Sequence, residues 1–159
     1  MPTTIRRTTL LVRDMEKSVQ WYEQVLGLTR YYDDIYTLTG TGFAVGKEGD
    51  KTHLVIMQGS HHDMGMIGLV QFVDPPLPAP EEIPTSITYG NPTFIVAVDD
   101  CRKAWEQAKA LGTHVHVEPH EWSVKGPKGE TRHYLSTSVF DPDGHFFELN
   151  EMLSMTPAD

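Results

Sequence analysis

Two segments of the chain share one pattern of hydrophobic and polar positions, with residue 93 of the second corresponding to residue 7 of the first. Each begins with a run rich in β-branched residues, 7–13 and 93–98, which is typical of a half-buried strand. An aspartate follows, Asp14 in the first copy and Asp99 or Asp100 in the second. Such a residue can accept hydrogen bonds from the first free amides of a helix. The pattern therefore predicts a strand and a capped helix in each copy.

The helices are predicted over residues 15–26 and 101–111, where apolar residues recur at helical spacing on one face. Gly27 and Gly112 follow them, and glycine readily takes the left-handed conformation that ends a helix. Three strand candidates come after each helix. They are residues 29–34, 42–46 and 53–58 in the first copy, and residues 114–118, 132–140 and 145–150 in the second.

A tight turn is expected between the last two strands, at Asp141-Pro142-Asp143-Gly144. The whole pattern predicts an α+β protein with a first βαβββ module at residues 1–58 and a second at 92–159. Residues 59–91 fit neither copy and are rich in proline, so we expect a lid, a dimer contact or an extended connection there.

Composition places the chain among ordinary globular proteins. It has 159 residues, of which 39% are hydrophobic and 22% charged, enough to form a core without a metal or a disulfide. The lone cysteine, Cys101, has no internal partner, which favours a reducing compartment. The longest apolar run, residues 66–73, is too short to span a bilayer. We therefore expect a cytoplasmic protein that makes no membrane contact.

The formal net charge is −9, and no cluster of basic residues offsets it. Phosphate backbones repel such a surface, so nucleic acid is not an expected partner. Acidity of this degree keeps a protein soluble, and a preference for cationic ligands is the alternative interpretation.

Three stretches resemble the vicinal-oxygen-chelate superfamily, which includes glyoxalases, bleomycin-resistance proteins and extradiol dioxygenases. They are residues 12–22 and 25–28 in the first copy, and residues 139–149 (Val-Phe-Asp-Pro-Asp-Gly-His-Phe-Phe-Glu-Leu) in the second. The resemblance covers nearly the whole chain outside the segment 59–91. It implies two modules that form a cupped, barrel-like mixed sheet with helices on the outside. It does not name a reaction, because the superfamily contains many different activities.

The resemblance also implies which side chains face the ligand, because the concave face of the family's sheet lines the cup. Side chains alternate along a strand, so Arg7, Glu148 and Tyr134 would face the cup as catalytic candidates. Further candidates for ligand binding are Thr9, Thr93, Ser136, Ser138, Ile56 and His133.

Metal-binding members of the superfamily take ligands from four strands, and only one of the four positions keeps a ligand here. The resemblance matches them to Arg7, Ile56, Thr93 and Glu148. An arginine stays protonated and cannot coordinate a metal ion. We therefore expect no cofactor, and a divalent metal, if one binds, would use Glu148. Arg7 would supply the positive charge, either for a ligand's oxygen or in a plain ion pair that joins the modules through Glu148.

These residues favour an enzyme of glyoxalase-like fold that is metal-independent and performs isomerase- or lyase-type acid/base chemistry on a small carbonyl compound. Glu148 would be the base, Arg7 would stabilise the oxyanion, and Tyr134 or His133 would donate a proton. One alternative is a non-catalytic drug-binding protein of the bleomycin-resistance type. Another is a divalent-metal-dependent lyase or dioxygenase. In each case the expected partner is a small molecule, and the protein is expected to be a homodimer.

Overall fold

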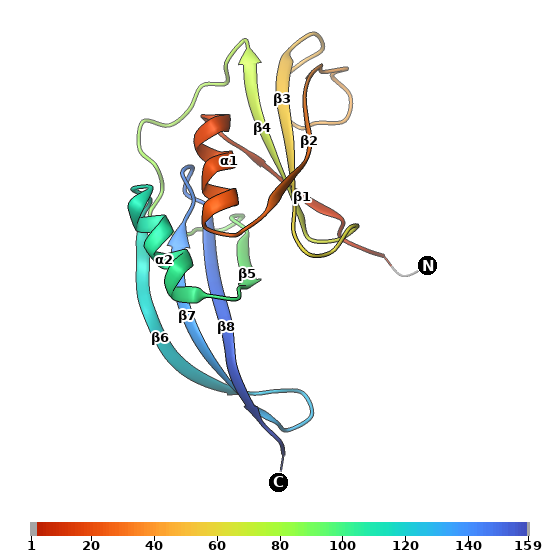
Figure 1. The fold of residues 1–159 in the computed structure, drawn as a ribbon. Helices are drawn as coiled ribbons and strands as arrows, with labels where there is room; N and C mark the ends of the chain where they lie inside the picture. Colours follow the sequence, from red (N-terminus) through yellow and green to blue (C-terminus); the bar gives the residue numbers. More distant parts are fainter. Residues whose placement is uncertain (1–2, 159) are drawn as a thin grey trace. The chain divides into compact units, whose positions relative to one another are not determined.

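The computed structural model describes residues 3–158, and these form two compact units, Met1–Glu82 and Ile83–Asp159. Each unit contains one helix and one four-stranded mixed sheet in the order βαβββ (Figure 1). The predicted α+β class and the two βαβββ modules are thus confirmed. Within residues 3–158, neither helix has the length and apolar character needed to cross a membrane.

The first unit has the sheet order β1-β4-β3-β2. Strand β1 is parallel to β4, and the other pairs are antiparallel. Its elements are β1 (Arg7–Leu11), α1 (Met15–Gln24), β2 (Thr29–Thr37), β3 (Lys51–Gln58) and β4 (Met66–Asp74).

The second unit repeats this arrangement in the order β5-β8-β7-β6, again with one parallel pair, β5 with β8. Its three long strands bend along their length (Figure 1). Its elements are β5 (Thr93–Ala97), α2 (Cys101–Ala110), β6 (Val115–Lys125), β7 (Thr131–Phe140) and β8 (Phe146–Thr156).

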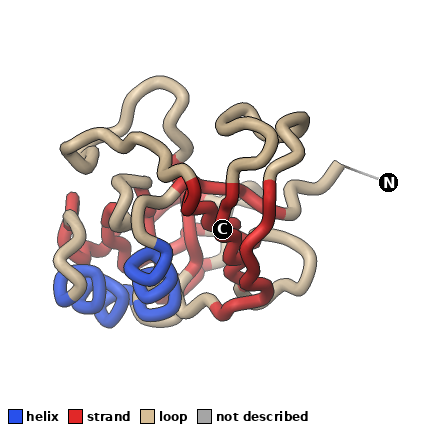
Figure 2. The backbone as a smooth tube through the Cα atoms, turned by 90° about the horizontal axis from the view of Figure 1, so that it is seen from above, coloured by secondary structure: helices blue, strands red, loops and turns tan. Residues whose placement is uncertain are grey.

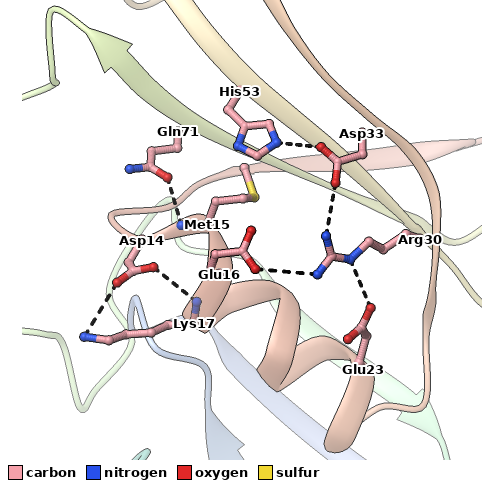
Figure 3. Close-up of polar contacts among 9 residues, drawn as sticks. All are labelled: Asp14, Met15, Glu16, Lys17, Glu23, Arg30, Asp33, His53 and Gln71. Carbon is pink, nitrogen blue, oxygen red and sulfur yellow. Dashed lines mark hydrogen bonds and ion pairs between the residues drawn. The ribbon is translucent and has the colours of Figure 1, made fainter.

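Both helices begin at the predicted caps. The Asp14 carboxylate accepts a hydrogen bond from the Lys17 amide at 3.2 Å (Figure 3). The Asp100 carboxylate accepts one from the Lys103 amide at 2.9 Å. These bonds satisfy amides that have no partner within the helix. Gly27 and Gly112 have φ values of 67° and 75°, so both helix stops are also as predicted.

A second contact ties each helix to the last strand of its own module. The Met15 amide donates to Oε1 of Gln71 on β4 at 2.8 Å (Figure 3). The Cys101 amide donates to Oε2 of Glu151 on β8 at 2.9 Å. The two modules therefore match in a specific hydrogen bond as well as in topology, with β4 corresponding to β8.

Each helix packs on one face of its own sheet and buries the core there. In the first unit Trp21 and Tyr22 of α1 have no exposed surface and meet edge to face, above Val55 and Leu69. In the second unit the buried residues beneath α2 include Val139, Phe147 and Leu149. The opposite face of each sheet is called its open face below.

A polar cluster joins the edge strand β2 to α1 (Figure 3). Arg30 pairs with Glu23 and Asp33 at 3.1 Å each, and Asp33 also contacts His53 Nε2 at 2.6 Å. The contacts with His53 and Arg30 lower the pKa of Asp33. These side chains are partly exposed to solvent, so the cluster orients the strand more than it stabilises the fold.

The strand expected at residues 42–46 is wrong, because these residues belong to a loop of residues 38–50. The loop closes on itself through Leu38 and Asp50, whose backbone groups bond at 2.8 Å. Four glycines in this stretch, at positions 40, 42, 46 and 49, disfavour a strand. Loops also connect β4 to β5 (tan in Figure 2).

Strand β4 lies within the segment 59–91 that we expected to form a lid or a dimer contact. Its apolar side chains Met66, Leu69, Val70 and Phe72 are each less than 8% exposed and pack within the first unit. They are therefore unavailable as a free apolar surface. The predicted turn at Asp141-Pro142-Asp143-Gly144 is confirmed, since the Gly144 amide donates to the Asp141 carbonyl at 3.1 Å.

The loop 38–50 packs against the open face of the first sheet. Leu38 forms a buried cluster there with Val70 and Phe72. Gly46, with φ 79°, lies so close that an added Cβ would come within 2.5 Å of the Phe72 ring and 2.8 Å of Leu38. The loop can close on the sheet only because this position carries no side chain.

We expect Gly46→Ala to destabilise the first unit by about 2–4 kcal/mol, since it combines overpacking with a strained positive φ. Urea unfolding measures the loss. Gly49→Ala is the matched control, because Gly49 has φ 93° but nothing within 4 Å of an added Cβ. An equal loss in both variants would contradict the close packing of the loop.

Candidate functional site

The open face of the first unit contains a cavity of about 290 Å³, which lies between the sheet and the loop 38–50. Side chains from β1, β2, β3 and β4 line it, together with the loop. The lining residues are Arg7, Thr9, Tyr36, Thr37, Leu38, Thr39, Gly40, Gly42, Phe43, Val45, Leu54 and Val70. Two predicted residues, Arg7 and Thr9, therefore line the cavity. The apolar and aromatic side chains that complete its lining were not predicted from the sequence.

Arg7 crosses the open face above Gly68 of β4. A Cβ at Gly68 would lie 3.0 Å from Cδ and 3.3 Å from Nε of Arg7, and 2.9 Å from the Thr9 hydroxyl. The arginine side chain thus occupies the space into which a side chain at position 68 would project. Of the described residues, 3–158, none forms an ion pair with the Arg7 guanidinium.

Strand register shows which residue of the first unit corresponds to Glu148. In the second unit Thr93 pairs with Phe146, and Ile95 pairs with Glu148. In the first unit the same register pairs Arg7 with Met66 and Thr9 with Gly68. Gly68 is therefore the counterpart of Glu148.

The predicted match of Ile56 to the position of Glu148 is wrong. Ile56 lies on β3, where it is the cross-strand neighbour of Gly68 and is 8% exposed. The error arose because β4 was left out of the repeat. A role of Ile56 in ligand binding stays a prediction.

Glu148 ends a chain of side-chain hydrogen bonds on the open face of the second unit. The Trp122 indole donates to the Ser136 hydroxyl at 2.6 Å, and that hydroxyl donates to Oδ1 of Asn150. The Asn150 amide nitrogen then donates to Oε1 of Glu148 at 3.0 Å. Because an indole can only donate, the direction of every bond in the chain is fixed.

The polarity of this chain orients the carboxylate. Asn150 donates from its amide nitrogen, so Oε1 of Glu148 accepts this bond and the carboxyl group is held on one side. Ser136 is 2% exposed, so its two bonds are shielded from water. Asn150 and Trp122 were not predicted as site residues, although Asn150 follows Glu148 at the two-residue spacing of one strand face.

The other predicted residues of the second unit surround this chain. Ser138 is the cross-strand neighbour of Glu148, and Thr93 lies on the adjacent edge strand β5. Tyr134 stacks on Trp122, with ring centroids 5.3 Å apart, and lines a second hollow together with Ile95, Asn150 and Met152. Their roles toward a ligand stay predictions.

His133 makes a different set of contacts. Its Nδ1 lies 2.7 Å from the Ser123 hydroxyl, and its Nε2 lies 3.2 Å from the Thr156 hydroxyl. These contacts run across β6, β7 and β8 and do not include Glu148 or Asn150. Of the two predicted proton donors, Tyr134 is therefore the one associated with the Glu148 chain.

The sequence model of the Glyoxalase/Bleomycin resistance protein/Dioxygenase superfamily matches residues 4–149. The chain belongs to this superfamily. The resemblance inferred from the sequence motifs is thus confirmed, while no curated protein matches the chain.

Solved structures of the superfamily share the fold. A glyoxalase family protein from Bacillus cereus aligns with a TM-score of 0.77 and 15% identity over 97% of both chains. The trypanothione-dependent glyoxalase I of Leishmania major aligns with a TM-score of 0.59 and 14% identity over 94% of this chain and 87% of its own. TnmS3, an antibiotic binding protein from Streptomyces sp. CB03234, aligns with a TM-score of 0.54 and 17% identity over 95% of this chain and 97% of its own. At these identities the likeness concerns the fold alone.

The superfamily's metal positions do not carry a set of ligands suited to a divalent ion in this chain. The first unit offers Arg7 and Gly68 there, a permanent cation and a residue without a side chain. The second unit offers Thr93 and Glu148, of which only Glu148 is a usual ligand. Among residues 3–158, no cluster of three or more histidine, cysteine, aspartate or glutamate side chains is placed to hold a metal ion.

A thiol nucleophile is also disfavoured. Cys101 is buried at the start of α2, and burial together with the nearby Glu151 raises the pKa of its thiol to about 11. At neutral pH the reactive thiolate is therefore scarce. The open faces of the two sheets instead present carboxylate, guanidinium, hydroxyl and amide groups.

We expect Ser136→Ala to destabilise the second unit by about 1–3 kcal/mol, because it leaves the Trp122 indole and the Asn150 carbonyl without their partner. Urea unfolding measures the loss, and a shift of the Trp122 indole NMR signal reports the broken bond. Ser138→Ala is the control, since Ser138 is 8% exposed on the same strand face and no hydrogen bond links it to the chain. Equal effects of the two substitutions would rule out the chain as a structural unit.

Proposed function

We propose that this chain is a metal-independent enzyme that performs isomerase- or lyase-type acid/base chemistry on a small carbonyl compound. The observation that carries the proposal is the hydrogen-bond chain from Trp122 through Ser136 and Asn150 to Glu148. A general base must be held in one orientation, and the bond from Asn150 to Glu148 supports this condition. Arg7 would supply a second group that such chemistry needs, a positive charge for an oxyanion.

The proposed step is a proton transfer next to a carbonyl group. The Glu148 carboxylate removes a proton from the adjacent carbon, and the electron pair of the broken C–H bond forms a C=C bond. The carbonyl π pair moves to oxygen, giving an enolate. Tyr134 donates its hydroxyl proton to the enolate oxygen, giving the enol, an isomer of the substrate at the same oxidation state. Transfer of the proton from Glu148 to the Tyr134 phenolate through solvent restores both groups.

Arg7 would stabilise the enolate oxygen. Cδ and Nε of Arg7 lie over Gly68, which places the guanidinium on the open face of the sheet. A guanidinium stays protonated throughout the reaction, and a single such donor is typically worth about 10²–10³ in rate. The proposal therefore assigns to Arg7 the electrostatic task that a metal ion performs elsewhere.

The second candidate function is binding without turnover. The cavity of the first unit favours it, because an apolar wall with one polar anchor is what a binding protein needs. Arg7 in that wall disfavours cationic drugs as ligands. The two candidates differ in whether Glu148 is required.

A cytoplasmic location, a homodimeric state and the absence of a cofactor complete the proposal. Cys101 is buried as a free thiol, as expected for a protein of a reducing compartment. Sedimentation of the purified protein measures the oligomeric state directly.

We expect the wild-type protein to catalyse exchange of the hydrogen next to a carbonyl in D₂O. A panel of small ketones, aldehydes and 2-oxo acids, followed by ¹H NMR, provides the measurement. Glu148→Gln should lower the exchange rate about 10²–10⁴-fold, because the amide cannot act as a base.

Glu118→Gln is the matched control, since Glu118 is an exposed carboxylate on β6 of the same unit, and its exchange rate should equal that of the wild type. Wild-type exchange rates in Glu148→Gln would refute the proposed base. Ligand-induced thermal stabilisation without exchange for any compound would favour the binding protein.

A further inference from the structure

The cavity of the first unit has one charged lining residue and an otherwise neutral wall. Arg7 carries the charge, and none of the lining residues is a carboxylate. Its guanidinium has no ion-pair partner among residues 3–158. A cationic ligand would meet repulsion here, while an anionic group would find an unpaired partner.

The chemistry of Arg7 narrows the anionic group. A guanidinium is planar and presents parallel N–H donors that match the two oxygens of a carboxylate. The Thr9 hydroxyl lies beside it, 2.9 Å from the point where a Cβ at Gly68 would stand. The Thr9 hydroxyl and the paired N–H groups of Arg7 together provide hydrogen-bond donors for a small planar anion.

The other lining residues indicate what kind of apolar group the ligand carries. Tyr36 and Phe43 contribute aromatic rings, while Leu54 and Val70 contribute aliphatic side chains from the sheet. A volume of about 290 Å³ is at the lower end of the range of about 300–1,000 Å³ typical of ligand sites. The cavity therefore suits one ring or one branched chain, and not an extended polycyclic molecule.

Gly68 gives this site its shape. An added Cβ would lie 2.9 Å from the Thr9 hydroxyl and 3.0 Å from Cδ of Arg7, so these side chains would have to shift by a few tenths of an ångström. We therefore expect the glycine to influence specificity through the position of Arg7, although it contributes no group to the ligand.

We propose that this cavity binds a small carboxylate with one aromatic or branched aliphatic group, the carboxylate on Arg7 and the apolar group against Phe43 and Leu54. The inference deepens the proposed function and rests on it in one respect: the substrate would be a 2-oxo acid, whose carboxylate and developing enolate oxygen are adjacent, so that one guanidinium can donate to both. Binding itself requires only residues of the first unit.

Calorimetric titration with three probes of equal size tests the proposal. Benzoate should bind at least tenfold more tightly than the neutral benzamide, and benzylammonium should not bind. Arg7→Gln should weaken benzoate binding at least tenfold and remove the preference over benzamide. Gly68→Ala should weaken benzoate binding severalfold without changing the lining of the cavity.

Arg6→Gln is the matched control, because Arg6 is the neighbouring arginine but pairs with Asp63 and does not line the cavity. It should leave benzoate affinity unchanged. NMR shift mapping on the wild-type protein gives an independent readout, and the benzoate-induced shifts should centre on residues 36–45 and on Leu54.

Equal binding of benzoate and benzamide, an unchanged affinity in Arg7→Gln, or shifts confined to the second unit would each overturn the proposal. Glu148→Gln separates it from the proposed reaction, since this variant should lose hydrogen exchange while benzoate binding is not weakened. Benzoate binding in a protein that exchanges no compound would support the carboxylate site and reject the enzyme.

Discussion

The side chain of Arg7 packs over Gly68, and the charge on the open face of the first unit follows from this contact. An added Cβ at Gly68 would lie 2.9 Å from the Thr9 hydroxyl and 3.0 Å from Cδ of Arg7, so the arginine stem lies where a side chain at position 68 would project. The first unit therefore presents a positive charge on its open face and no metal ligand at the corresponding positions. The proposed class of ligand depends on this charge.

The two modules keep the same scaffold and differ at the site. Both pair the first strand with the last in one register, and in both the first helix amide donates to a side chain of the last strand. At two corresponding positions the residues differ. The first unit has Arg7 where the second has Thr93, and the second has Glu148 where the first has Gly68. The proposed base and the proposed anion-binding group therefore lie in separate units.

Much of the fold could be predicted because local signals were strong: capping aspartates, helix-ending glycines and the Asp-Pro-Asp-Gly turn act within a few residues. Strand β4 was missed because its residues 66–73 form an apolar run, interrupted by Gly68 and Gln71, that shows no alternation of apolar and polar positions. The cavity could not be predicted either, since Tyr36, Phe43 and Leu54 come together only when the loop 38–50 folds onto the sheet. Strand alternation gave the direction of Glu148 and Asn150 but not the bond between them.

A crystal structure of untagged protein soaked in Mn²⁺, with anomalous data recorded near the manganese edge, distinguishes an arginine site from a metal site. We expect the Arg7 side chain to lie across Gly68 and no anomalous peak beside Glu148. An arginine turned out to solvent, with a manganese ion bound to Glu148, would show instead that the site holds a metal.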